Sequence, residues 1–180
     1  FVNFYTDNQN QKPGWTAFYS TCTSAEVPVI TAGGPTSICA GSNVVLTANK
    51  LNNYLWSTGD TTINTIVTPL STTTYYATVS NGINSCIDSV KITVPILDTS
   101  ITVLDTSSTI CSNNGSVRLQ AGIATSYQWL FNGSPIPNAT SRIDTARQSG
   151  SYRVIVTNSL GCKDTSRAIQ VNIYSLPTTP

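Results

Sequence analysis

The amino-acid sequence predicts an all-β chain that consists mainly of two β-sandwiches in tandem. Three observations support this prediction: an internal repeat, an alternation of apolar and polar residues within each copy, and turn-forming clusters between the alternating segments. No stretch keeps the apolar period of an amphipathic helix. Several short strands separated by turns are typical of sandwich folds.

The two copies of the repeat match in spacing as well as in composition. Cys39 and Cys86 in the first copy correspond to Cys111 and Cys162 in the second. In both copies a leucine precedes a tryptophan by ten residues, as Leu46 and Trp56 and as Leu119 and Trp129. We therefore assign residues 25–96 to a first module and residues 97–175 to a second.

Each copy contains four alternating segments, which we predict to be strands with one buried face. The segments are residues 44–48, 54–56, 75–79 and 90–94 in the first copy and 117–121, 127–131, 152–156 and 169–173 in the second. Turn-forming pairs such as Asn81-Gly82 and Asn132-Gly133 lie between them. The alternation predicts that Trp56 and Trp129 are core residues rather than sugar-stacking platforms, whereas Leu55 and Tyr76 face outward.

Composition and charge argue against several classes of protein. Ser, Thr and Asn account for 66 of the 180 residues, charged residues for 9%, and the nine Lys and Arg residues are scattered singly at a net charge of +1. Nucleic-acid binding relies on clustered positive charge, and membrane insertion needs about 18–20 consecutive apolar residues, so we expect neither. With no His and a single Glu, the chain has few groups for general acid–base catalysis or metal binding, and we predict that it is not an enzyme.

Several motifs in the repeats resemble the immunoglobulin-like modules of large secreted surface proteins of the Bacteroidota. The motifs include the segment Tyr127-Gln128-Trp129, the hairpin around Asn132-Gly133, and the stretch from Gln148 to Tyr152, which is similar to a tyrosine corner. The resemblance extends over about residues 27–174 and implies tandem immunoglobulin-like β-sandwiches. It also implies a secreted protein at the cell surface.

The five cysteines favour disulfides, and therefore an oxidising, extracellular compartment. In the antibody-type pattern the core disulfide would link the positions that Ala121 and Val154 occupy here. The cysteines of this chain lie further out instead, before the second strand and after the last but one. We expect the pairs Cys39–Cys86 and Cys111–Cys162, although the antibody-type topology does not by itself bring the two ends of the sandwich that carry these cysteines together.

The first 24 residues resemble the last hairpin of a CUB domain, with an aromatic strand, an Asp-containing loop and the strand 14–19. This resemblance implies that Asp7 could be one ligand of a calcium ion, with the other ligands upstream; an Asp that caps a turn is the alternative. Calcium is the one cofactor that the resemblance suggests. Cys22 is then expected to be unpaired within this chain.

The function that we expect is structural and adhesive: a stalk or filament segment of an extracellular multi-module protein. Its partners would be neighbouring modules, other copies of the protein and surface glycans, and residues 176–180 would be a linker to a further module. The alternative is an accessory spacer or carbohydrate-binding region of a secreted hydrolase. Three short Asp-Ser/Thr motifs resemble Bacteroidota O-glycosylation sites, with Thr61, Ser89 and Thr145 as the acceptors.

Overall fold

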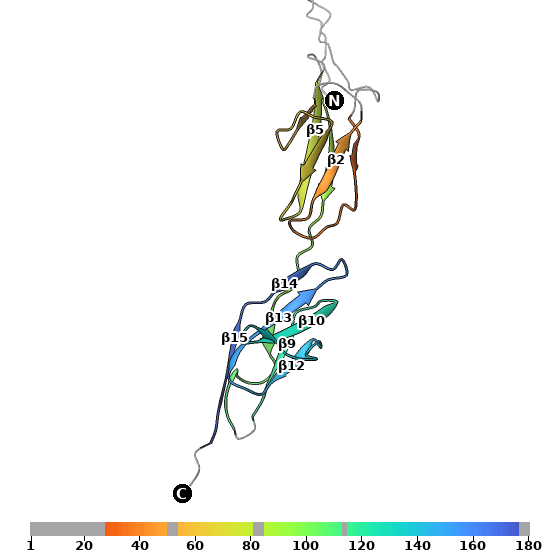
Figure 1. Cartoon of the computed structure of the whole chain (residues 1–180). Helices are drawn as coiled ribbons and strands as arrows, with labels where there is room; N and C mark the ends of the chain where they lie inside the picture. Colours follow the sequence, from red (N-terminus) through yellow and green to blue (C-terminus); the bar gives the residue numbers. More distant parts are fainter. Residues whose placement is uncertain (1–27, 50–53, 81–84, 113–114, 177–180) are drawn as a thin grey trace, which may run out of the picture.

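Two β-sandwiches follow each other along the long axis of the molecule in the computed structural model (Figure 1). The structure describes residues 28–49, 54–80, 85–112 and 115–176. These residues contain fifteen strands and no helix, so nothing in the described part is a helix that could cross a membrane. The predicted hairpin of residues 1–24, with Asp7 and Cys22, lies outside the described residues, and so does most of the predicted linker 176–180.

The first module has six strands in two sheets. They are β1 (Ile30–Ala32), β2 (Val44–Ala48), β3 (Tyr54–Trp56), β4 (Asn64–Val67), β5 (Thr73–Ser80) and β6 (Ser85–Ile92). One sheet has the order β1-β2-β4 and the other β3-β5-β6, with antiparallel neighbours in both. The Asp88 carboxylate of β6 accepts a hydrogen bond from Ile30 N at 2.8 Å and so connects edge strands of the two sheets.

The core of the first module lies between these sheets. Leu46 of β2, Trp56 of β3 and Ile92 of β6 are almost completely buried, as the alternation predicted. The Trp56 indole N–H donates to Thr62 O at 2.8 Å, which satisfies the one polar group of this buried side chain. Leu55 and Tyr76 are exposed, as expected for the opposite face.

The second module has nine strands and a larger sheet. They are β7 (Ile101–Val103), β8 (Thr109–Cys111), β9 (Val117–Ala121), β10 (Ser126–Phe131), β11 (Ser134–Pro135), β12 (Ile143–Ala146), β13 (Gly150–Thr157), β14 (Lys163–Thr165) and β15 (Ile169–Tyr174). One sheet has the order β12-β9-β7; the other has the order β11-β10-β13-β15-β8, with β14 also paired to β13. The pairing of β8 with β15 is parallel. This order of strands is that of an immunoglobulin-like sandwich.

Two features predicted from sequence are confirmed in the second module. Trp129 is fully buried, and its indole N–H donates to Ser141 O at 2.9 Å, as Trp56 does to Thr62 O in the first module. The Tyr152 hydroxyl donates to Gln148 O at 3.1 Å, which is the hydrogen bond of a tyrosine corner. Burial raises the pKa of this hydroxyl even further above neutral pH, where a tyrosine is protonated in any case, so the hydroxyl is a donor.

Candidate functional site

The junction between the modules contains a disulfide that the sequence did not predict. Cys39 of the first module bonds to Cys162 of the second, with their Cα atoms 5.2 Å apart and a sequence separation of 123. The predicted pairs Cys39–Cys86 and Cys111–Cys162 are therefore both wrong. Cys86 is disulfide-bonded as well, and Cys111 is a free, exposed thiol.

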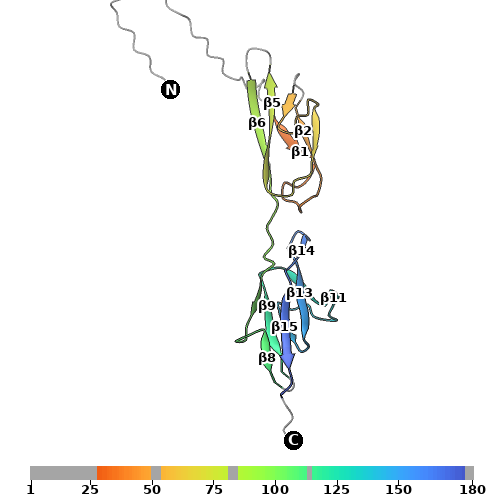
Figure 2. The same ribbon diagram turned by 90° about the vertical axis from the view of Figure 1, so that its left-hand side faces the viewer.

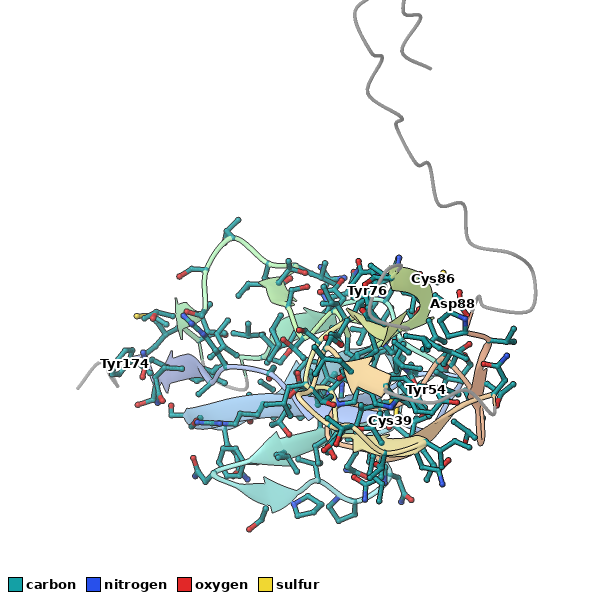
Figure 3. The ribbon with its side chains drawn as sticks, turned by 90° about the horizontal axis from the view of Figure 1, so that it is seen from above. Cys39, Tyr54, Tyr76, Cys86, Asp88 and Tyr174 are labelled. Atoms are coloured by element: carbon teal, nitrogen blue, oxygen red, sulfur yellow. A yellow bond between two sulfur atoms is a disulfide. The ribbon has the colours of Figure 1, made fainter. Side chains whose placement is uncertain are left out.

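The predicted pairs fail because each would join opposite ends of one module. Cys86 lies at the start of β6, whereas Cys39 lies beside Thr93, just past the end of β6, because Ile38 N donates to Thr93 O at 3.0 Å. Seven residues of strand separate the two ends by roughly 23 Å, far beyond the Cα separation of a disulfide. In Figure 3, which looks down the long axis, Cys39 also lies to the side of Cys86 and Asp88 across the width of the molecule.

The same argument applies to the second module. Cys162 directly precedes β14, at the end of the sandwich that faces the first module (Figure 2). Cys111 is in register with Tyr174, at the far end of β15. The length of the sandwich therefore lies between these two cysteines.

A tight turn positions Cys39. Ser42 N donates to Cys39 O at 3.0 Å, and Gly41 at the third position of the turn has a φ of 76°. Glycine adopts this left-handed conformation without a steric cost, which explains why it follows Cys39 by two residues. Gly41 N also donates to Pro69 O at 2.9 Å, so the turn is held against the neighbouring loop.

A hairpin between β13 and β14 positions Cys162. The Asn158 side-chain oxygen accepts hydrogen bonds from Leu160 N and Cys162 N, both at 3.0 Å. Asn158 N donates to Cys162 O at 3.0 Å, and Gly161 has a φ of 81°. Cys162 is thus fixed in a hydrogen-bonded hairpin before it reaches across to the first module.

Apart from this bond, the junction has little apolar packing. The connecting residues pass from Val94 to Leu97, and the side chain of Ile96 is 99% exposed. Leu70 beside it is 78% exposed. Cys39, Cys162, Leu70 and Ile96 all line one hollow of about 600 Å³ between the modules. A junction that is open in this way does not derive its geometry from a hydrophobic interface, so the disulfide and the linker define it.

Asp98 anchors the start of the second module just after the linker. Its two carboxylate oxygens accept hydrogen bonds from Ser100 N at 3.1 Å and Ile123 N at 3.2 Å. Hydrogen bonds from the Ser100 side chain, Ser100 N and Ile123 N hold the pKa of this carboxyl below its usual value. The charged carboxylate therefore fixes where the linker enters the sandwich.

A shallow groove on the second module is the other candidate site. It has a volume of about 350 Å³, and Phe131, Ile136 and Tyr152 form its apolar part. The side chains of Asp144 and Arg147 add one acidic and one basic group. Burial raises the pKa of the Asp144 carboxyl, whereas the hydrogen bond from Thr145 N partly opposes this shift.

The predicted modification residues are accessible but do not form a common site. Thr61 and Ser89 are exposed on the first module, and Thr145 is exposed on the second. Among the described residues, no group of His, Cys, Asp and Glu could hold a metal ion. The suggested calcium ligand Asp7 lies outside these residues, so calcium binding stays a prediction.

No protein-family model and no curated protein matches this chain. Among solved structures, it is similar to the fibronectin(III)-like modules of Clostridium thermocellum CbhA, at 15% identity and a TM-score of 0.36 over 82% of this chain and 95% of that one. The Down syndrome cell adhesion molecule is similar at 12% identity and a TM-score of 0.42, over 81% of this chain and 23% of that one. The human OSCAR ligand-binding domain is similar at 14% identity and a TM-score of 0.36, over 80% of this chain and 97% of that one.

Proposed function

We propose that the chain is a structural segment of an extracellular, multi-module surface protein, in which a disulfide locks adjacent modules in a fixed order and orientation. The observation that supports this proposal is the Cys39–Cys162 bond. Two covalent connections, the linker and the disulfide, join the same two modules. A disulfide between modules persists only in an oxidising compartment, which supports secretion.

The disulfide also changes the path of a pulling force. Tension applied at the two ends of the chain passes along the backbone to Cys39, across the bond to Cys162 and on to the other end. Residues 40–161, which include Trp56, Trp129 and most of both cores, lie outside this path. While the bond is intact, the strands between the two cysteines therefore bear no tension along their backbone, and of the described strands β1, β14 and β15 remain in the path. Such protection of most of both modules suits a stalk or filament that holds an adhesive tip or contacts a surface itself.

Single-molecule force spectroscopy tests this proposal. The sequence separation of 123 between Cys39 and Cys162 corresponds to about 400 Å of extended chain. We expect the fully reduced chain to unfold to a contour length about 400 Å greater than the oxidised chain does. In the matched control Cys39→Ala/Cys162→Ala, reduction can release only the bond of Cys86, so the difference should be clearly smaller than about 400 Å. Equal contour lengths for the oxidised and reduced chains would reject the proposed function.

A second candidate function is glycan binding at the groove of the second module, as in a carbohydrate-binding region of a secreted hydrolase. The combination of Phe131 and Ile136 with Asp144 and Arg147 favours it, because sugars bind to apolar surfaces flanked by charged hydrogen-bonding groups. Titration with a panel of neutral and acidic oligosaccharides, followed by NMR, tests it. Binding should weaken in Arg147→Ala and persist in Arg167→Ala. If no oligosaccharide of the panel binds, glycan binding is rejected and the structural function is the one that stands.

A further inference from the structure

Cys39 and Cys111 occupy the same place in their respective modules. In the first module, Thr93 N donates to Thr36 O at 2.7 Å, and Cys39 follows Thr36 by three residues. In the second module, Asn172 N donates to Ser108 O at 2.9 Å, and Cys111 follows Ser108 by three residues.

The register of the last strand confirms this equivalence. Thr93 directly follows Ile92, and Asn172 directly follows Val171; Ile92 and Val171 are both fully buried. The two cysteines therefore lie on parallel pairings of the same register, at the C-terminal end of each sandwich.

Cys86 and Cys162 occupy the opposite end of their modules. Cys86 is the second residue of β6 and pairs with Val79, and Cys162 directly precedes β14. Both are buried, and both are disulfide-bonded. Each module thus has one cysteine at each end, too far apart to bond to each other.

The observed bond joins the cysteine at the C-terminal end of one module to the buried cysteine at the N-terminal end of the next. We propose that Cys111 forms the equivalent bond with a further β-sandwich module, C-terminal to the second, that presents a cysteine in the hairpin position of Cys162. This inference rests on the proposed function and extends it from one junction to a series.

Two observations at the far end of the second module support this partner. Cys111 is exposed and free, whereas its equivalent Cys39 is bonded. Tyr174, in register with Cys111, is 57% exposed and occupies the position that Pro95 has at the observed junction. A leucine also lies at the same place in both modules, because Leu97 and Leu176 each follow the buried strand residue Ile92 or Val171 by five residues.

Formation of the bond is an ordinary thiol–disulfide exchange. The Cys111 thiolate attacks one sulfur of an oxidised disulfide, such as glutathione disulfide or an oxidised dithiol oxidoreductase, and releases one thiol. The thiolate of the partner cysteine then attacks the mixed disulfide and releases the second thiol. Two cysteine thiols lose two electrons and two protons, and the oxidant gains both.

An extended chain tests the inference. Residues 1–176 are followed by a second copy of residues 98–174, which reproduces the linker length of the observed junction. The added copy contains Cys111→Ser, so that the extended chain has a single Cys111. It also contains Ser159→Ala in an exposed turn position, which labels its Cys162 peptide by mass. The protein is refolded with reduced and oxidised glutathione and alkylated without reduction. It is then digested with trypsin and with a protease that cleaves after Glu26, which separates Cys22 from Cys39, for mass spectrometry.

We expect the peptide of Cys111 to be linked to the labelled Cys162 peptide, and the peptide of Cys39 to the unlabelled one. In a control in which the added copy also has Cys162→Ser, Cys111 should be recovered in alkylated form. An alkylated Cys111 in the extended chain, or its linkage to any other cysteine, would overturn the inference. The Cys39 peptide in the same digest shows separately whether the bond behind the proposed function has formed.

Discussion

Loss of the junction disulfide should destabilise both modules, although neither core is changed. When the first module unfolds beside a folded second module, the bond still closes its chain from Cys39 to Leu97. A loop of roughly 60 residues corresponds to about 4 kcal/mol of restricted chain entropy in the unfolded state. Unfolding of the second module leaves the segment from Leu97 to Cys162 closed in the same way, with a similar value.

The folded state offsets part of this effect. Without the bond, Ile96 and Leu97 of the linker regain backbone freedom worth about 1 kcal/mol each. Pro95 gains less, because its ring already fixes φ. The net loss is therefore about 2 kcal/mol in the free energy of unfolding of each module in Cys39→Ala/Cys162→Ala.

Native-state hydrogen exchange with mass spectrometry measures this loss, because it gives a separate free energy of opening for each module. The single variant Cys39→Ala should lose nearly as much as the double variant, since one substitution already removes the bond. Cys111→Ala, at a free and exposed cysteine, is the matched control and should change neither module by more than about 0.5 kcal/mol. Unchanged free energies in the double variant would refute the chain-entropy argument.

Three further predictions concern single residues. Tyr152→Phe removes the tyrosine-corner hydrogen bond and should lower the stability of the second module by about 1 kcal/mol, measured by thermal unfolding. The N–H and guanidinium of Arg118 lower the pKa of the Asp105 carboxyl, so Asp105→Asn should be destabilising at pH 7, with the difference disappearing as the pH falls through that lowered pKa. Gly122→Ala should be destabilising by about 1–3 kcal/mol, because its Cβ would overlap the Asp98 carboxylate.

Each of these predictions has a control or a contradicting result. Tyr76→Phe alters an exposed tyrosine and should leave the stability unchanged. An equal loss of stability in Tyr76→Phe would show that the effect of Tyr152→Phe does not come from the tyrosine-corner hydrogen bond. Gly34→Ala meets no atom within 4 Å and should be tolerated. If Asp105→Asn keeps the same stability difference from pH 7 down to pH 2, the carboxylate contributes nothing through its charge.

The strands that were predicted from sequence are those with a strong local signal. Val117, Leu119 and Ala121 alternate with polar residues and are all buried, so the sequence pattern directly reflects the fold. β12 was not predicted, because Ala146 is its single buried residue. β4 was missed for a similar reason: its two buried residues are Thr65 and Val67, and a buried threonine resembles a surface residue in sequence.

The disulfide pairing could not be read from the repeat, because the repeat shows which cysteines are equivalent and not which are close. Equivalence alone suggested a bond within each copy. The strand lengths contain the missing information: β6 separates Cys86 from the end at which Cys39 lies. The exposed Cys111, by contrast, gave no signal in the sequence that distinguished it from Cys39.

A module with one cysteine at each end cannot use both of them internally. Each of its cysteines is either free or bonded outside that pair: in the first module Cys39 and Cys86 are both bonded, and in the second module Cys162 is bonded and Cys111 is free. The exposure of Leu70 and Ile96 shows why a covalent bond is needed at this junction: a packed interface of apolar residues is missing there. Since the bond does not depend on buried apolar area, the orientation of such modules should survive conditions that weaken hydrophobic contacts, as long as the environment remains oxidising.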